Sequence, residues 1–233
     1  MNISTNKPEI ICYMMTSVDG RIDCAMTANL PGVEDYYPLL DAFQFDATVS
    51  GRRTVELEMA LPGKFEARNS SPIHQEKISN KVHGTKPFDV VVATHGGLLW
   101  NKAETYANPL IMVCSEQVPA EYLEYLDDQN ISYIATGEKE INLARAVEIL
   151  HDEFGINRLG IVGGATINTG FLDTGLLDEV DVLIGAGIDG RAQFPPIFNR
   201  QDNGTSLTKL KLLGVEHKPG SEAVLLRYQV LNQ

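Results

Sequence analysis

The chain has 233 residues, with 31 acidic and 19 basic side chains, and carries a formal net charge of −12. This balance excludes a protein whose main partner is a nucleic-acid backbone, because phosphate recognition along a strand requires a basic face. No run of about 18 apolar residues predicts a membrane span, and the first residues lack an apolar core of signal-peptide length. We therefore expect neither a membrane protein nor an exported one.

The three cysteines, Cys12, Cys24 and Cys114, show no spacing typical of a disulfide framework or a zinc site. The five histidines are scattered, and none belongs to a known metal or nucleophile motif. We therefore expect no metal and a reducing, cytoplasmic compartment.

Apolar runs of strand length alternate with segments of helical spacing through most of the chain. Strands are predicted at residues 9–15, 46–50, 89–93, 109–114, 131–135, 159–162 and 180–184. Helices are predicted at residues 34–45, 55–61, 119–128, 143–154 and 165–172. Asn142 should cap the fourth helix and Gly155 should end it. Such alternation predicts a parallel sheet built by right-handed crossovers.

Two regions depart from this alternation. Residues 62–88 have no convincing period, so we predict a long loop around one helical turn, which would suit a flap over a substrate. Residues 206–213 and 222–230 alternate and are joined by a Pro-Gly turn, which predicts an antiparallel hairpin at the end of the sheet. No linker or repeat divides the chain, so residues 1–233 are predicted to form a single α/β domain.

Residues 158–184 read as strand, glycine turn, helix and strand in one run. Glycines let bare backbone approach an anion, and the first N–H groups of the helix point toward it. Gly163, Gly164, Ala165 and Thr166 are therefore predicted to hold the phosphates of a nucleotide cofactor. The alternative is a tight turn that needs small residues to pack the helix on the sheet.

The same order of strand, glycine and helix start occurs at Gly51, Arg52, Arg53 and Thr54. A helix start prefers anions, so two arginines there are better suited to bind an anion than to stabilise the helix. Arginine suits bidentate phosphate contacts, which makes this pair a candidate for a 2′-phosphate or a pyrophosphate, with Thr54 as a hydroxyl donor. The alternative is a solvated pair of surface arginines.

A polar turn at residues 16–23 follows the first strand, at the sheet edge where open α/β folds bind ligands. Asp19 and Glu58 are the best acidic candidates for proton transfer or for orienting a polar ring, with Asp23 behind them. Asp19-Gly20 also has the chemistry of an ordinary turn. The glycine turn after Thr94 closes another strand, and His95 beside it is a weaker candidate for a ligand contact.

Residues 185–190 spell G-x-G-x-x-G directly after a predicted strand. A dinucleotide fingerprint needs a helix to begin there, whereas Pro195 and Pro196 follow at once. We therefore expect these glycines to border a substrate cleft or to form a wide turn.

With these residues in place, the chain resembles the reductase half of the riboflavin-biosynthesis deaminase/reductase family, which shares its fold with dihydrofolate reductase. The motifs that carry the resemblance are TSVDGRID at 16–23, GRRTV at 51–55, DVVVAT at 89–94, GIVGGATINTGFLDTGLLDEV at 160–180 and LRY at 226–228. The resemblance covers nearly the whole chain. It implies a dihydrofolate-reductase-like three-layer α/β/α fold with a mostly parallel central sheet.

The resemblance also implies a function, the NADPH-dependent reduction of 5-amino-6-(5-phosphoribosylamino)uracil by hydride transfer to the ribosyl C1′. It implies a homodimer and a stand-alone reductase without a deaminase domain. Ser17, Asp19 and Glu58 are expected on the substrate side, with Asp19 and Glu58 as the candidate catalytic residues. The expected cofactor-binding residues are Gly51, Arg52, Arg53, Thr54, Thr94, Gly163, Gly164, Ala165 and Thr166.

Some residues depart from the family pattern. Val162 replaces a usual glutamate, Met59 and Ala60 lie where Asp-Pro is common, and a Trp-Ile-Ser segment is absent. Two alternatives therefore stay open: a reductase of another small heterocycle such as a pterin or folate, and a nucleotide-binding regulator without turnover.

Overall fold

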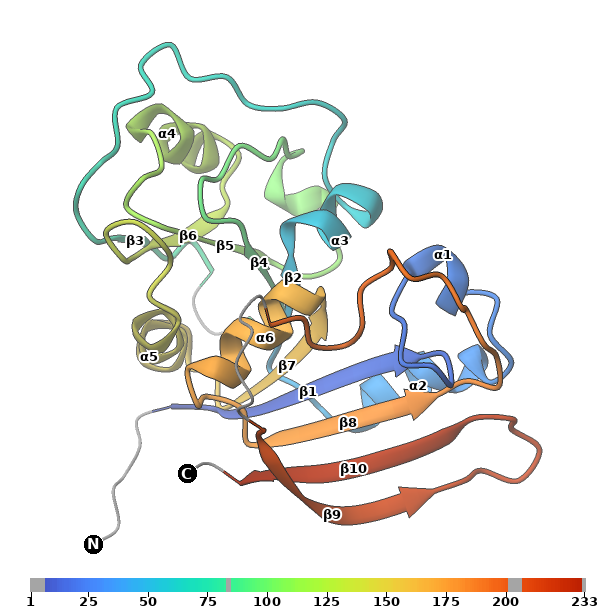
Figure 1. Cartoon of the computed structure of the whole chain (residues 1–233). Helices are drawn as coiled ribbons and strands as arrows, with labels where there is room; N and C mark the ends of the chain where they lie inside the picture. Colours follow the sequence, from blue (N-terminus) through green and yellow to red (C-terminus); the bar gives the residue numbers. More distant parts are fainter. Residues whose placement is uncertain (1–6, 83–84, 201–206, 232–233) are drawn as a thin grey trace, which may run out of the picture. The chain divides into compact units, whose positions relative to one another are not determined.

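The computed structural model describes residues 7–82, 85–200 and 207–231 (Figure 1). Ser206, where the predicted hairpin begins, and the first six residues lie outside the described residues. The chain forms two compact units: unit 1 is Met1–Pro8 with Asp46–Leu159, and unit 2 is Glu9–Phe45 with Gly160–Gln233. The single domain stays a prediction.

Unit 1 is built on a mostly parallel sheet with the strand order β3-β6-β5-β4-β2. Its strands are β2 Ala47–Gly51, β3 Lys77–Ser79, β4 Phe88–Val92, β5 Leu110–Cys114 and β6 Ser132–Ala135. The pairs β2–β4, β4–β5 and β5–β6 are parallel, whereas β3 is antiparallel to β6. The helices are α3 Arg52–Glu58, η2 Ala103–Thr105, α4 Ala120–Asp128 and α5 Leu143–Phe154.

Both predicted ends of helix α5 are confirmed. The Asn142 side chain accepts a hydrogen bond from the backbone N–H of Arg145, and Gly155 ends α5 with φ 66°, both as predicted. The predicted loop at 62–88 is wrong at β3, because a three-residue strand that begins with the exposed Lys77 has no apolar pattern to reveal it.

Unit 2 has the strand order β7-β1-β8-β10-β9. Its strands are β1 Glu9–Thr16, β7 Arg158–Gly163, β8 Glu179–Ile184, β9 Lys209–Glu216 and β10 Val224–Leu231. β1 and β8 are parallel, and the β9–β10 hairpin joins antiparallel to β8, which confirms the predicted end of the sheet. The helices are α1 Cys24–Thr27, η1 Val33–Asp35, α2 Tyr36–Ala42 and α6 Ala165–Asp173.

The sheet of unit 2 encloses charged groups. Asp181 on β8 is fully buried, and Arg227 on β10 donates to its carboxylate at 3.2 Å and to Glu179 at 2.8 Å. Burial, together with the hydrogen bond and charge of Glu179, raises the pKa of Asp181 to about 7. This face of the sheet packs against η1 and α2, whose apolar side chains join Ile11, Tyr13 and other residues of β1 in one core.

The structure also bears on the cysteines and on membrane crossing. Cys12 and Cys114 are buried free thiols, and Cys24 is exposed. Among the described helices, none has the length and apolar character needed to cross a bilayer.

Candidate functional site

The first candidate site lies in unit 1, where β2 passes into α3. Gly51 has extended backbone, with φ −81° and ψ 163°, and α3 begins at Arg52 rather than at the predicted residue 55. The two arginines and Thr54 therefore occupy the first turn of the helix. We call Gly51, Arg52, Arg53 and Thr54 the α3 corner.

The two arginines of the α3 corner differ in their surroundings. Arg52 donates from Nε to Glu56 Oε1 at 2.7 Å and from Nη1 to the carbonyl oxygen of Gly96 at 2.9 Å. Arg53 is exposed and makes no hydrogen bond to another described residue. Arg52 therefore orders the corner, while Arg53 has all its donors available for a ligand.

The glycine turn after β4 lies beside the α3 corner, because β2 and β4 are parallel neighbours and end at the same sheet edge. Thr94 is half-buried, and its carbonyl oxygen accepts from Ser115 N at 2.9 Å and Ser115 Oγ at 2.8 Å. A Cβ at Gly96 would lie 2.3 Å from the ring of Tyr122, so only glycine fits there. Within unit 1 the structure thus brings the turn at Thr94 together with Arg52.

Glu58 is the last residue of α3 and is exposed. Its carboxylate makes no hydrogen bond to another described residue. Its predicted role on the substrate side stays a prediction.

The second candidate site lies in unit 2, where β7 passes into α6. Gly164 has φ 94° and ψ 122°, a conformation that side chains with a Cβ rarely adopt. No described side chain caps the start of α6, so its first N–H groups are left for a ligand or water. Ala165 is buried and Thr166 is exposed. We call Gly163, Gly164, Ala165 and Thr166 the α6 corner.

The body of α6 is held by the segment that follows β8. The buried Asn168 donates from Nδ2 to the carbonyl oxygen of Ile197 at 2.9 Å. Thr169 Oγ1 accepts from the backbone N–H of Asn199 at 2.8 Å. These bonds fix the helix and so fix the position of the α6 corner.

The polar turn after β1 is organised around Asp19. Its carboxylate accepts from Ser17 Oγ at 2.7 Å and from the backbone N–H groups of Asp189 and Gly190, each at 2.9 Å. The hydrogen bond from Ser17, followed by the two backbone donors, lowers the pKa of Asp19 below its usual range. Ser17 is buried and also accepts from Arg21 N. These contacts favour an ionised carboxylate that anchors the turn, and the catalytic role of Asp19 stays a prediction.

The G-x-G-x-x-G segment at 185–190 forms an irregular connection, with no helix between β8 and β9 among the described residues. This confirms that it is not a dinucleotide fingerprint. The segment instead provides the two N–H donors to Asp19, a role that the sequence did not reveal.

Arg191 is a further residue that sequence reasoning missed. It pairs with Asp189 and, from Nη2, with Asp23 Oδ2 at 2.9 Å. Its guanidinium also lies 3.6 Å from the ring centre of Phe194. The sequence shows the polar turn at 16–23, which contains Asp23. It does not show that Arg191, about 170 residues further along the chain, pairs with this turn.

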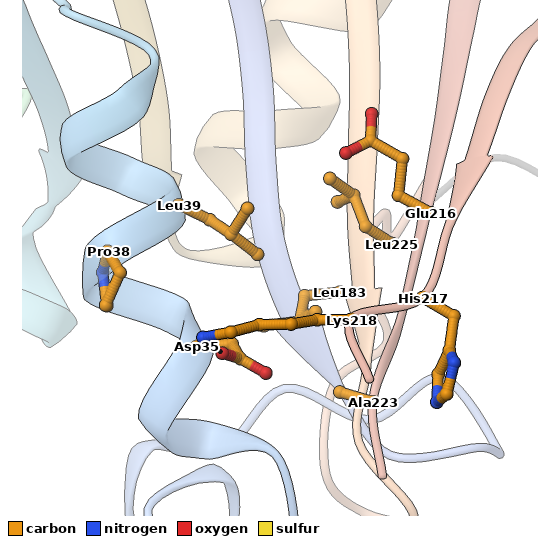
Figure 2. Close-up of a pocket in the computed structure, with 9 residues that line it drawn as sticks. All are labelled: Asp35, Pro38, Leu39, Leu183, Glu216, His217, Lys218, Ala223 and Leu225. Carbon is orange, nitrogen blue, oxygen red and sulfur yellow. Dashed lines mark hydrogen bonds and ion pairs between the residues drawn. The ribbon is translucent and has the colours of Figure 1, made fainter. Parts of the chain in front are cut away.

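A hollow of about 220 Å³ lies elsewhere in unit 2, between η1, α2 and the β9–β10 hairpin (Figure 2). Figure 2 shows the Lys218 side chain reaching across it to Asp35, and the two form an ion pair of 2.8 Å. The hydrogen bond from Lys218 holds the pKa of Asp35 below its usual range. None of the predicted site residues lines this hollow.

The mixed sheet, parallel through most of its strands and closed by a hairpin, defines an α/β protein with the dihydrofolate-reductase-like fold of reductases. The chain belongs to the RibD C-terminal domain family, whose model matches residues 8–222. It is an oxidoreductase of this family, and the family supports the use of a nicotinamide cofactor.

One curated relative is the 2,5-diamino-6-ribosylamino-4(3H)-pyrimidinone 5′-phosphate reductase of Methanothermobacter thermautotrophicus. The two sequences are 35% identical over 195 residues, which is 79% of this chain and 80% of the relative. This confirms the resemblance to the riboflavin-biosynthesis reductases.

Solved structures share the fold at low sequence identity. RibD of Acinetobacter baumannii has a TM-score of 0.71 and 20% identity over 98% of this chain, which spans 59% of that RibD chain. A pyrimidine reductase-like protein of Corynebacterium diphtheriae has a TM-score of 0.72 and 18% identity, covering 98% of this chain and 94% of that one. The riboflavin biosynthesis reductase Rib7 of Saccharomyces cerevisiae has a TM-score of 0.63 and 16% identity, covering 99% and 93%.

Proposed function

We propose that this chain reduces a phosphorylated ribosylaminopyrimidine with NADPH in riboflavin biosynthesis. A hydride from the nicotinamide adds to C1′ of the ribosyl group, the C1′–O4′ ring bond breaks, and a proton goes to O4′, which leaves an open ribityl chain and NADP⁺. The observation that carries the proposal is the 35% identity, over 79% of the chain, to a reductase named for such a substrate.

The α3 corner supports NADPH over NADH. A 2′-phosphate needs charged, planar donors, and the exposed Arg53 has five N–H groups without a protein partner among the described residues. Arg52 adds positive charge, although Glu56 neutralises part of it. Gly51, Thr54 and Thr94 complete the contacts that we propose for unit 1.

The α6 corner supports a phosphate contact of a different kind. Gly164 at φ 94° turns the backbone sharply before α6, and the first N–H groups of this nine-residue helix have no side-chain cap. We propose that Gly163, Gly164, Ala165 and Thr166 hold cofactor phosphate through the backbone. When bound, the cofactor supplies the hydride, and these residues only hold and orient it.

On the substrate side we propose Ser17, Asp19 and Glu58. The anchored carboxylate of Asp19 holds its turn in one shape, which is what positioning a substrate requires. Glu58 is exposed and is the proposed candidate for proton transfer.

Two pyrimidines are candidate substrates. 5-amino-6-(5-phosphoribosylamino)uracil is the substrate implied by the family resemblance. The diaminopyrimidinone of the archaeal relative is the second candidate, favoured by that relative's printed name.

The test is a steady-state assay with both pyrimidines and both nicotinamide cofactors, followed by absorbance at 340 nm. We expect turnover with NADPH, at least about tenfold slower turnover with NADH, and a clear preference for one pyrimidine ring. A protein that binds NADPH but oxidises it with neither substrate would be a regulator or a reductase of another heterocycle, and the proposal would be wrong.

We also propose a cytoplasmic homodimer. The free thiols of Cys12 and Cys114 suit a reducing compartment. The family resemblance supports the dimer, and sedimentation of the purified protein would test it.

A further inference from the structure

The loop that follows α3 is fixed to the glycine turn after β4. Leu61 N donates to the carbonyl oxygen of Leu99 at 2.9 Å, and Phe65 N donates to that of Gly97 at 3.0 Å. The ring of Phe65 also packs against two tyrosine rings of α4, with ring centroids 5.3 and 5.0 Å away. The short segment between the two backbone bonds therefore has a fixed course within unit 1.

Lys64 lies in this segment and reaches over Gly97. A Cβ added to Gly97 would lie 3.6 Å from Lys64 Cε and 3.8 Å from Arg52 Nη1. Two cationic side chains from different segments thus lie against the same buried glycine. Lys64 is exposed, and its ammonium makes no ion pair with another described residue. Because like charges held close together repel each other, such an arrangement is stabilised when an anion binds to it.

A 2′-phosphate carries more negative charge than the α3 corner alone can neutralise. Phosphate monoesters carry about −1.5 to −2 at pH 7. Arg53 supplies one positive charge without a partner among the described residues, whereas Arg52 shares its charge with Glu56 at 2.7 Å. Lys64 supplies a second unshared charge, beside the same glycine turn to which Arg52 donates.

The choice between the two nicotinamide cofactors needs a local group of cations. At −12 the chain repels an anionic cofactor over most of its surface. The α6 corner offers only backbone groups and uncharged side chains, which NADH and NADPH can use equally. Discrimination therefore falls to the cations of unit 1.

We propose that Lys64 is a specificity-determining residue, whose ammonium binds the 2′-phosphate of NADPH together with Arg53. The inference rests on the proposed NADPH-dependent function and adds a residue that lies outside every motif of the family resemblance. Lysine acts on a phosphate as a point charge, so its contribution depends on its charge and its position more than on a planar geometry. The bonds of Leu61 and Phe65 to the glycine turn and its neighbour supply that position.

Binding of NADPH and of NADH at one fixed ionic strength tests the role of Lys64. Lys64→Ala should weaken NADPH binding about fivefold to tenfold and leave NADH binding within about twofold, because only NADPH carries the extra phosphate. Lys64→Arg keeps the charge and should keep most of the NADPH affinity. Lys64→Glu adds a repulsive charge and should weaken NADPH binding more than alanine does. Lys139→Ala, at an exposed lysine of unit 1 outside the α3 corner, should change neither affinity.

Lysine labelling of the wild-type chain keeps the test independent of variant folding. The chain is treated with a lysine-directed acylating reagent alone, with saturating NADPH and with saturating NADH, and the modified peptides are quantified by mass spectrometry. Labelling of Lys64 should be at least about threefold slower with NADPH than with NADH, because a bound phosphate keeps the ammonium protonated.

The outcomes separate this inference from the function on which it rests. The role of Lys64 is overturned if Lys64→Ala keeps the wild-type preference for NADPH, if it weakens both cofactors equally, or if Lys64 is labelled at the same rate with either cofactor. A wild-type chain that binds NADH as tightly as NADPH would overturn the proposed cofactor and this inference together. Turnover of the pyrimidine is assayed separately, so its absence beside an intact NADPH preference would count against the function and not against Lys64.

Discussion

The two units place their charges in opposite ways. In unit 1 the charged groups of the candidate site are on the surface, where Arg53 is exposed and Arg52 is shared between Glu56 and the Gly96 carbonyl. In unit 2 the α6 corner has no charged side chain, and a buried carboxyl, Asp181, lies within the sheet beside the half-buried Arg227. Unit 1 thus offers a charged side chain, Arg53, with which it could select a ligand by charge. Unit 2 offers the uncapped backbone N–H groups at the start of α6, and it carries a buried carboxyl, Asp181, in its core.

The largest expected effect concerns the buried carboxyl of Asp181 in unit 2. The folded chain keeps a proton on Asp181 up to a pKa of about 7, whereas the unfolded chain loses it near the ordinary value of 3.8. This group therefore lowers stability as the pH rises from about 4 to 7. Asp181→Asn removes the titration, so its gain in stability over wild type should be about 2.5 kcal/mol larger at pH 8 than at pH 5. Urea unfolding at both pH values measures this.

The control for this prediction is Asp41→Asn, which neutralises an exposed carboxylate of the same unit and should shift stability equally at both pH values. A stability difference for Asp181→Asn that does not change with pH would show that the buried carboxyl is not the sensitive group.

The next effect concerns the backbone of the α6 corner. Gly164→Ala and Gly175→Ala each put a side chain at positive φ, at the two ends of α6, and each should cost about 1–2 kcal/mol of stability. Only Gly164→Ala should also weaken NADPH binding, by about tenfold or more, because its methyl group blocks close approach to the backbone. Titration of intrinsic fluorescence with NADPH compares the two variants. Equal affinities would remove the α6 corner from the cofactor site.

A smaller effect is expected at the α3 corner, where the two arginines should contribute unequally to the preference for NADPH over NADH. Arg53→Ala should reduce the preference for NADPH over NADH by about tenfold, the value of one charged hydrogen-bonding group. Arg52→Ala should reduce it less, since that guanidinium already bonds to Glu56 and to the Gly96 carbonyl. Competition binding with both cofactors measures the preference, and Lys139→Ala serves as the control. If Arg52→Ala had the larger effect, the distinction between the two arginines would be wrong.

The predictable parts of the fold are those with local causes. Asn142 and Gly155 mark the ends of α5 because capping acts within one helical turn, and the apolar run at β5 marks a strand buried on both faces. β3 was missed because its stability comes from β6, more than fifty residues away, and not from its own three side chains.

The site residues that could be predicted are likewise those marked by neighbouring residues in the sequence. The glycines of both corners were visible because strand, glycine and helix follow one another in sequence. The anchoring of Asp19 was not visible, since its donors at Asp189 and Gly190 belong to a segment that resembled a nucleotide motif. A buried carboxyl such as Asp181 leaves no mark either, because an acidic residue in a strand usually faces solvent.

The proposed reaction moves a hydride from NADPH to the ribosyl carbon of a pyrimidine. The most direct measurement uses NADPH in which both hydrogens at C4 of the nicotinamide are deuterium, and follows the product by NMR and mass spectrometry. One deuterium at C1′ of a ribityl product per NADPH oxidised is the predicted result. A ribityl product without deuterium, or bound NADPH that stays unoxidised with both pyrimidines, would contradict it.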